Sequence, residues 1–376
     1  MTQLVEKKAG LEGVVAANSS ISHVDGEAGK LIYRGYTIGD LAAHCRFSEV
    51  AYLLWHGRLP NANELAELER SLGAHRPLSE RMMKVLTTLP VSAPPMSLLR
   101  TCVSAIGLED PRAESNEFDT NLEIAIELTA QMSSVIAAVR RLRRGLEPIE
   151  PEPGMTHAGS FLHMLTGRMP DDIAQHVFDD CLILHAEHGF NASTFTARVT
   201  AATLSDTYSA ITGAIGALRG PLHGGANMKV MKMLEEIGEP SKAADYVKDL
   251  LARKQRVMGF GHRVYKTEDP RAVILRDWSR KLGESLGDTK WFEMSSIIEK
   301  IMLEEKGLHC NVDFYSASVY RLLKIPPDLF TPIFALARTT GWTAHVLEQY
   351  SNNRLIRPLC KYVGPVGLKV VPIEDR

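Results

Sequence analysis

Apolar residues recur at three- and four-residue spacing along most of the chain after residue 40, a periodicity that is typical of amphipathic helices. Gly and Pro residues stand in the gaps between these stretches, so the gaps read as turns and loops. The pattern predicts helices over 40–55, 63–75, 120–144, 171–188, 206–218, 228–237, 269–286 and 329–350, the last with Asp328 as its cap. We therefore expect a mainly α fold, and no repeat of about 20 to 50 residues indicates a solenoid.

An alternating pattern of apolar and polar side chains is confined to the N-terminal region. Residues 21–25 and 30–33 alternate in this way, and Gly26 and Gly29 stand between them. This arrangement predicts one small β-hairpin in front of the helices.

Composition indicates a folded globular protein and excludes some partners. The 376 residues exceed one typical domain, which indicates two or three domains. Hydrophobic residues make up 45% of the sequence, which excludes wholesale disorder. Lys and Arg total 43 and Asp and Glu total 45, so we expect no nucleic-acid binding through bulk positive charge, and any anion site must be local.

The cysteines and the apolar runs give no sign of metal binding, secretion or membrane insertion. The five cysteines are scattered and form no C-x-x-C pair, so we interpret them as free thiols. No run of 18 apolar residues occurs, and the first 20 residues lack the apolar core of a signal peptide. We expect a cytoplasmic protein without a membrane partner.

A pair of histidines, His185 and His188, stands before Gly189 at the predicted end of a helix, and Asn191 is placed to cap the next helix. The spacing of three puts both histidines on one helix face, but the zinc-protease pattern needs a spacing of four with a Glu beside the first His. We therefore predict no metal site here. Taken alone, His188 is better explained as a structural residue.

A glycine-rich loop, Gly220-Pro-Leu-His223-Gly-Gly-Ala-Asn227, leads into a helix that runs to Gly238. The two glycines after His223 allow backbone or ligand to approach closely. The positive end of the following helix disfavours an imidazolium, which predicts a neutral His223 that donates one hydrogen bond. An ordinary turn explains the loop equally well.

Basic and histidine side chains are crowded into residues 259–271, which read Gly-Phe-Gly-His-Arg-Val-Tyr-Lys-Thr-Glu-Asp-Pro-Arg. The Gly-x-Gly pair is not a dinucleotide fingerprint, because the third glycine is absent and no strand precedes it. The Asp-Pro pair is typical of a helix start, so Arg271 falls in the first turn, where a bound anion would offset its repulsion by the helix dipole. His262, Lys266 and Arg271 together favour an anion site over a solvated surface.

An aspartate, Asp313, follows Asn311-Val at the start of another apolar helix. Burial beside Val312 and Phe314 would raise the pKa of its carboxyl and make it a usable base near neutral pH. A simple helix cap is the alternative, and the stretch alone favours the cap.

Two further arginines occupy unusual positions. Arg338 lies inside the apolar stretch 330–342, and Arg357 precedes a proline. A buried guanidinium needs a carboxylate or phosphate partner, whereas Arg357 could also lie on the surface.

In this order, the motifs resemble those of the citrate synthase family. The resemblance covers nearly the whole chain and rests on Gly10-Leu-Glu-Gly, His23-Val-Asp-Gly, Tyr33-Arg-Gly, Pro-Leu-His223-Gly-Gly, Gly-Phe-Gly-His262, Asn-Val-Asp313 and Arg357-Pro. It implies a two-domain helical fold with the active site in the cleft between the domains, and a homodimer. By position, the large domain covers 1–223 and 323–376 and the small domain covers 224–322.

The resemblance also implies a role for each motif. In the family, the residue matching His223 hydrogen-bonds the thioester carbonyl of acetyl-CoA, and the residue matching Asp313 removes the methyl proton. The residue matching His262 protonates the ketone oxygen of oxaloacetate. The oxaloacetate ligands match His188, Arg271, Arg338 and Arg357, the last from the partner subunit, and Lys266 and Lys306 match positions that approach the CoA phosphates. No metal or redox cofactor is implied.

The implied activity is that of a citrate (Si)-synthase, which makes citrate from acetyl-CoA and oxaloacetate for the tricarboxylic acid cycle. 2-Methylcitrate synthase is the alternative, because one extra methylene in propionyl-CoA is worth only about 1 to 3 kcal/mol of discrimination. A non-catalytic CoA-binding or helical assembly protein is a further alternative.

The sequence departs from the family pattern in two places. Leu308-His309-Cys310 stands where relatives often have an aromatic residue and a proline. The long N-terminal extension of the NADH-inhibited relatives is absent, so we expect no NADH site of that kind.

Overall fold

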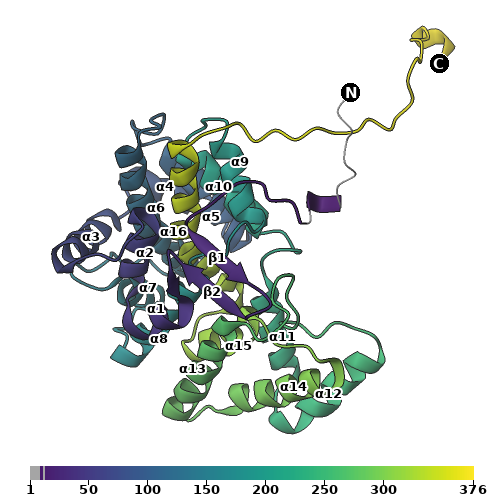
Figure 1. Cartoon of the computed structure of the whole chain (residues 1–376). Helices are drawn as coiled ribbons and strands as arrows, with labels where there is room; N and C mark the ends of the chain where they lie inside the picture. The colour runs from purple at the N-terminus through teal and green to yellow at the C-terminus, as the bar shows by residue number, and fades with distance from the viewer. Residues whose placement is uncertain (1–8, 12) are drawn as a thin grey trace.

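The computed structural model describes residues 9–11 and 13–376, so the Gly10-Leu-Glu-Gly motif lies partly outside the described residues. The described part is mainly helical, as the apolar periodicity predicts (Figure 1). The α-helices are α1 (Ile38–His44), α2 (Phe47–His56), α3 (Ala62–His75), α4 (Glu80–Thr88), α5 (Pro95–Gly107), α6 (Phe118–Leu142), α7 (His157–Thr166), α8 (Asp172–His185), α9 (Ala192–Ala201), α10 (Thr207–Leu218), α11 (Ala226–Ile237), α12 (Pro240–Ala252), α13 (Pro270–Leu286), α14 (Lys290–Lys306), α15 (Val312–Leu322) and α16 (Phe330–Ser351). Short 3-10 helices cover η1 (Ala9–Leu11), η2 (Pro327–Leu329) and η3 (Ile373–Asp375).

The predicted hairpin is present and forms part of a small antiparallel sheet. Its strands are β1 (Ser22–Asp25), β2 (Lys30–Tyr33) and β3 (Tyr36–Thr37), in the order β1-β2-β3. Ser22 pairs with Tyr33, and Asp25 pairs with Lys30 next to the turn. The third strand has only two residues, too few to show an alternation in the sequence.

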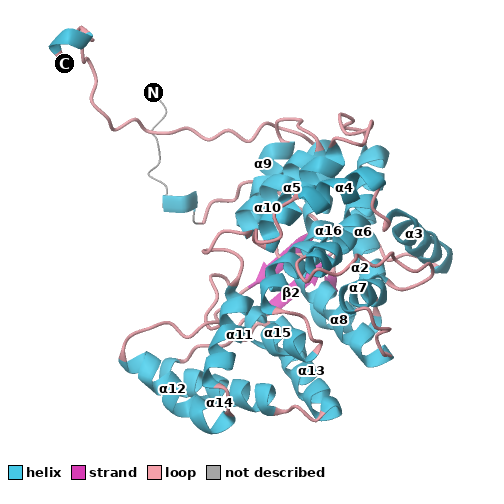
Figure 2. Cartoon of the chain, turned by 180° about the vertical axis from the view of Figure 1, so that it is seen from behind, coloured by secondary structure: helices cyan, strands magenta, loops and turns pink. Residues whose placement is uncertain are grey.

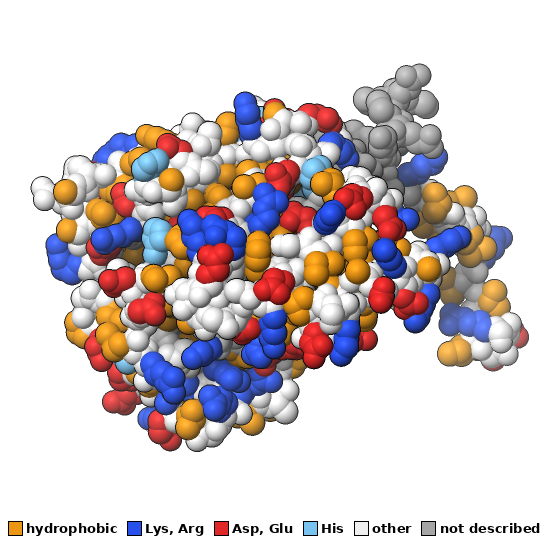
Figure 3. Space-filling view, turned by 90° about the horizontal axis from the view of Figure 1, so that it is seen from below, with side chains coloured by type: hydrophobic (Ala, Val, Ile, Leu, Met, Phe, Trp, Pro, Cys, Tyr) orange, Lys and Arg blue, Asp and Glu red, His pale blue; other side chains and the backbone are white. Residues whose placement is uncertain are grey.

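The core of the protein surrounds α16, which is buried along most of its length. It packs against α2, α6, α8, α9 and α10. Among the described residues, α6 is the one helix whose length and apolarity fit a membrane span, but 72% of its apolar window is buried inside the protein, as in a core helix. On the outside, acidic and basic side chains are interspersed over the face seen in Figure 3, in keeping with a net charge of -2.

Helices α11 to α15 gather at one end of the molecule, below the small sheet in Figure 1 and again from behind in Figure 2. Within this group α13 packs on α15, and α12 packs on α14. The group is joined to the rest mainly where α13 contacts α1 and α8 and where α11 contacts α16. The division of the chain at 223/224 and 322/323 stays a prediction.

Several helix boundaries differ from those that the apolar periodicity predicts. The stretch 40–55 forms α1 and α2, because Cys45 and Arg46 are extended and the Glu49 side chain accepts a hydrogen bond from the Arg46 N–H, which starts a new helix. The prediction that Asp328 caps the last helix is wrong, since Asp328 lies in η2 and pairs with Arg143. The apolar pattern also missed α4, α5, α7, α12 and α14.

Candidate active site

The turn between α8 and α9 carries His188. The helix ends at His185, three residues earlier than predicted, so the two histidines do not share a helix face and that prediction is wrong. Asn191 caps α9 as predicted, because its Oδ1 accepts hydrogen bonds from the backbone N–H of Ser193 and Thr194. His188 therefore lies in an irregular segment, free of the constraint of helical hydrogen bonding.

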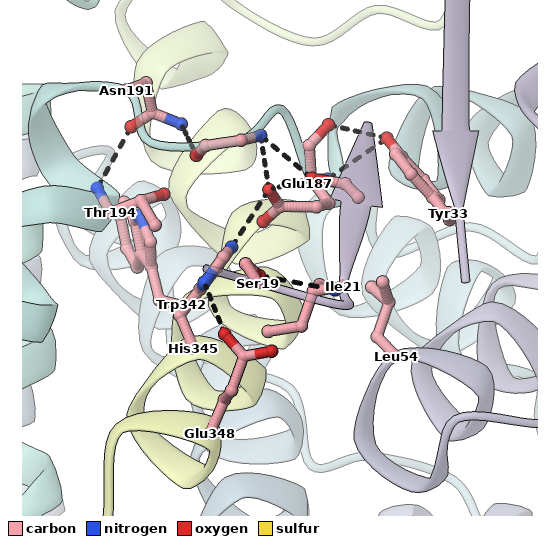
Figure 4. A network of polar contacts seen from close by, with 12 residues as sticks. Ser19, Ile21, Tyr33, Leu54, Glu187, Asn191, Thr194, Trp342, His345 and Glu348 are labelled. Atoms are coloured by element: carbon pink, nitrogen blue, oxygen red, sulfur yellow. Dashed lines mark hydrogen bonds and ion pairs between the residues drawn. The ribbon is translucent and has the colours of Figure 1, made fainter. Parts of the chain in front are cut away.

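A buried carboxylate, that of Glu187, fixes the backbone of this turn. Glu187 Oε1 accepts hydrogen bonds from Ser22 Oγ at 2.9 Å and from the backbone N–H of Gly189, and it lies 3.1 Å from His345 Nε2 on α16 (Figure 4). These partners keep the pKa of Glu187 below its usual value although burial acts in the opposite direction. The result is a fixed backbone on both sides of His188.

His188 meets the loop that carries His262. The ring centroids of His188 and His262 lie 5.2 Å apart, and His188 Nε2 is 3.2 Å from the hydroxyl oxygen of Tyr265. Burial lowers the pKa of His188 well below its usual value, and the nearby guanidinium groups of Arg271 and Arg338 lower it further. Two motifs that are 74 residues apart, at positions 188 and 262, therefore form one cluster.

Backbone amides fix the orientation and the tautomer of His262. Its Nδ1 accepts hydrogen bonds from the backbone N–H of Val264 at 3.0 Å and of Tyr265 at 3.2 Å. An amide nitrogen can only donate, so the proton of the neutral ring is assigned to Nε2. Burial and then the charge of Arg271 lower the pKa of His262 to about 4, which keeps the ring neutral near pH 7.

His223 is held in the same manner by the start of α9. The backbone N–H of Ser193 donates to His223 Nε2 at 3.2 Å, so the proton of the neutral ring is assigned to Nδ1. Burial and the charge of Arg338 lower the pKa of His223 to about 4, in agreement with the predicted neutral ring. The motif places Gly225 at φ 85°, where glycine is favoured, as the N-cap of α11.

Arg271 and Asp269 form a buried two-pronged ion pair at the start of α13. Nε of Arg271 donates to Asp269 Oδ1 at 3.0 Å, and Nη2 donates to Oδ2 at 2.8 Å. Asp269 is the N-cap of α13, as the Asp-Pro pair predicts, and its Oδ2 also accepts the N–H of Val312 at 3.2 Å. One carboxylate thus offsets the charge of Arg271 and joins the starts of α13 and α15.

Arg338 is a buried cation of a different kind. It is 1% exposed on α16, and its Nε donates to the carbonyl oxygen of His185 at 2.7 Å. Within residues 9–11 and 13–376 no ion pair includes Arg338, and the Glu187 carboxylate acts on it only from beyond ion-pair distance. Burial lowers its pKa to about 10, so it remains charged near pH 7 and is suited to bind an anion.

Asp313 lies in the first turn of α15 but does not cap it. The cap is Asn311, whose Oδ1 accepts the N–H of Asp313 and whose Nδ2 donates to the carbonyl of Gly261, both at 3.0 Å. Asn311, not Asp313, is therefore the helix cap, and the Asp313 carboxylate does not serve in capping. Burial raises its pKa to about 6, as predicted, although the charge of Arg271 opposes the increase.

Three of the predicted site residues lie apart from this cluster. Lys266 and Lys306 are exposed, and only the charge of Lys266 acts on the cluster, by lowering the pKa of His262. Arg357 lies in the C-terminal tail, where it lines a groove of about 940 Å³ between residues 16–20 and 348–357. In the part of the chain that the structure describes, it makes no hydrogen bond or ion pair with His188 or His262, nor with His223 and Asp313, which join their cluster through the charges of Arg271 and Arg338.

Four residues of the site were not predicted as functional: Ser193, Tyr265, Asp269 and Glu187. Tyr265 and Asp269 stand within the motif that was singled out, and Ser193 follows the predicted cap by two residues. Each acts by contacting a histidine or arginine, so proximity to the predicted residues was the available signal.

The chain is similar to known citrate synthases over its whole length. The family described as "Citrate synthase, C-terminal domain" matches residues 10–359. A citrate synthase of Haloferax volcanii is 51% identical over 99% of both chains, and a 2-methylcitrate synthase of Shewanella oneidensis is 45% identical over 98% of both.

Solved structures agree with the sequence comparison. The citrate synthase of Pyrobaculum aerophilum superimposes with a TM-score of 0.92 at 40% identity and covers 100% of both chains. The citrate synthase of Thermoplasma acidophilum, solved as a ternary complex with carboxymethyl coenzyme A and oxaloacetate, superimposes with a TM-score of 0.91 at 33% identity and covers 98% of both chains. The chain therefore belongs to the citrate synthase family, whose members are acyl-transferring enzymes.

Proposed function

We propose that this protein is a citrate (Si)-synthase, which condenses acetyl-CoA with oxaloacetate and hydrolyses the resulting citryl-CoA to citrate and CoA. The observation that carries the proposal is the matched set of protonation states in one cluster. His223 and His262 have pKa values of about 4 and are neutral donors near pH 7, while Asp313, with a pKa of about 6, is ionised. A base and two neutral donors are the groups that an enolisation and condensation require.

In the first step, Asp313 takes a proton from the methyl group of acetyl-CoA. The proton is very weakly acidic, so the developing enolate oxygen needs a donor at the same time. His223 supplies that donor through Nδ1–H, because its Nε2 accepts the N–H of Ser193. A neutral imidazole is suited to this role because it stabilises the oxygen without first giving up a full proton to it.

In the second step, the enol carbon attacks the ketone carbon of oxaloacetate, and the ketone oxygen gains a proton. His262 supplies it from Nε2, because Nδ1 accepts hydrogen bonds from two backbone amides. The proton that Asp313 took from the methyl group then replaces the one that His262 gave, so the protons balance. Arg271, Arg338 and His188 bind the oxaloacetate carboxylates and keep the ketone beside His262, since guanidinium forks match carboxylates in geometry and charge. Hydrolysis of the thioester then releases citrate and CoA.

In this proposal, the remaining predicted site residues bind CoA or act in the site of the partner subunit. Lys266 and Lys306 are exposed cations suited to the CoA phosphates. Arg357 completes the oxaloacetate site of the other subunit of a homodimer, in line with its position outside its own cluster. We further propose a cytoplasmic location and the two-domain division made from the sequence.

Thiol release from acetyl-CoA and, separately, from propionyl-CoA tests the function, with and without oxaloacetate and with mass identification of the product. Oxaloacetate-dependent release that favours acetyl-CoA supports the proposal. A propionyl-CoA preference would assign the chain to 2-methylcitrate synthase, the name carried by one of its relatives. No release from either thioester would favour a non-catalytic CoA-binding or assembly protein.

A further inference from the structure

The tip of the β1–β2 hairpin packs directly on the loop that carries His262. The backbone N–H of Lys266 donates to the carbonyl oxygen of Gly26 at 2.9 Å. A Cβ atom on Gly26 would overlap the carbonyl oxygen of Val264, and a Cβ atom on Gly29 would lie 2.8 Å from Thr267 Cγ2. The two glycines therefore allow an approach that a side chain at position 26 would prevent.

The peptide group that faces Gly26 is one of those that orient His262. The carbonyl of Val264 and the N–H of Tyr265 belong to the same planar peptide unit. That N–H donates to His262 Nδ1 at 3.2 Å. A displacement of the Val264 carbonyl by a side chain at position 26 must therefore move a hydrogen bond that fixes the His262 ring.

The other end of the same hairpin holds the turn that carries His188. The hydroxyl of Tyr33 donates to the carbonyl oxygen of Glu187 at 2.7 Å and accepts the Glu187 N–H at 3.1 Å (Figure 4). Ser22 Oγ accepts the N–H of Gly189 at 3.2 Å. One hairpin thus contacts the backbone on both sides of His188 as well as the loop of His262.

The hairpin is fixed at both ends. Leu31 and Tyr33 on β2 are buried in the core. At the tip, Asp25 Oδ1 accepts the backbone N–H of Glu27 at 3.1 Å and of Ala28 at 2.9 Å, which closes the turn. The tip is therefore tied to the core at one end and closed by its own hydrogen bonds at the other.

We propose that the β1–β2 hairpin is a positioning element for the reaction, in which Gly26 sets the orientation of His262 while Ser22 and Tyr33 set that of His188. In this role the hairpin acts through the backbone of the two histidine segments. This inference rests on the proposed function, because the orientation of His262 matters only if that ring transfers a proton.

The test is the variant Gly26→Ala, with Gly39→Ala as its matched control. Both variants add one methyl group, but a Cβ atom on Gly39 in α1 meets nothing within 4 Å. We expect kcat for citrate formation to fall about 10- to 100-fold in Gly26→Ala, since small misplacement of a reacting group has effects of this size. The ratio kcat/KM for oxaloacetate should fall by the same factor, because protonation by His262 occurs in the transition state. The control should stay within about twofold of the wild type.

A second variant covers the case in which Gly26→Ala does not fold. Asp25→Ala removes the acceptor that closes the turn without adding volume, and we expect a smaller fall of kcat in the same direction. Melting followed by circular dichroism identifies any general loss of structure. Wild-type values of kcat in both hairpin variants would overturn the positioning role alone, whereas a wild type that makes no citrate would overturn the proposed function and, with it, this inference.

Discussion

At the level of single residues, burial moves the pKa values of the proposed donors and of the proposed base in opposite directions, so that their order is reversed. The same loss of water that lowers the pKa of His223 and of His262 to about 4 raises the pKa of Asp313 to about 6. The arginines beside them strengthen the effect on the histidines and weaken it on the aspartate. Near pH 7, all three groups are therefore in the state that the proposed reaction needs.

The pH dependence of the rate should follow Asp313. Below a pH of about 6 its carboxyl becomes protonated and can no longer accept the methyl proton, so we expect kcat/KM for acetyl-CoA to fall by about tenfold per pH unit. Rate measurements between about pH 5 and 8 check this. A midpoint above about pH 7 would instead assign the titration to another group.

Replacing the proposed base, Asp313, should lower the turnover number. Asp313→Asn keeps the size of the side chain and removes the base, so we expect kcat to fall by about 10²- to 10⁴-fold, the usual contribution of a positioned base. Asp245→Asn, at an exposed position on α12, is the control and should keep its activity. Near-wild-type turnover of Asp313→Asn would rule out the proposed proton transfer.

The same substitution should stabilise the fold. The pKa of Asp313 is raised from 3.8 to about 6, so the folded protein binds this proton more tightly than the unfolded chain does. Stability contributed by the protonated form is therefore lost as the pH rises from about 4 to about 6, and the loss is complete at pH 7. We expect Asp313→Asn to raise Tm near pH 7 and to have a smaller effect near pH 4.5, as thermal melting at the two pH values would show.

The sequence predicted those site residues whose chemistry is visible in a short motif. His223, His262 and Asp313 each stand beside glycine or a helix cap, and such signals are local. Ser193 and Glu187 were missed because their roles depend on contacts with distant segments, such as that between Ser193 and His223, which are 30 positions apart. Motif spacing carries no information about which backbone amide will face a ring nitrogen.

At the level of elements, capping hydrogen bonds decide where helices end, and the apolar periodicity does not record them. It continues through Cys45 and Arg46, where the capping interaction of Glu49 starts α2. It also continues past His185, where α8 gives way to the turn of His188. The existence of long helices such as α6 and α16 was predictable because their apolar faces extend over many turns.

The contact between the His188 turn and α16 should contribute strongly to stability. Glu187 and His345 are both fully buried and paired at 3.1 Å. We expect Glu187→Ala to lower the free energy of unfolding by about 3 kcal/mol, because it leaves the buried His345 Nε2 without its partner and removes one of the two acceptors of the Gly189 N–H. Urea unfolding measures the change, and Glu235→Ala at an exposed position on α11 is the control. A loss no larger than that of the control would show that the pair contributes little.

At the level of the whole molecule, the C-terminal tail is largely exposed in the described part of the chain. It extends away from the body after α16 and carries exposed apolar side chains, with Leu359 at 74% and Val363 at 87% exposure (Figure 1). Apolar residues in such number along an extended segment are typical of a surface that packs on another chain. In the homodimer proposed above, a second copy of the chain would cover the tail and receive Arg357 at its oxaloacetate site.

Mixing two inactive variants tests this arrangement. Arg357→Ala and Asp313→Asn should each be nearly inactive as homodimers, because every site lacks either the partner's arginine or its own base. In a mixed dimer, one site combines the intact Asp313 of one subunit with the intact Arg357 of the other. Random exchange of equal amounts makes half of the dimers mixed, each with one intact site, so we expect about a quarter of the wild-type activity to return. If mass spectrometry shows that the subunits have exchanged and no activity returns, Arg357 acts within its own chain or has no part in the site.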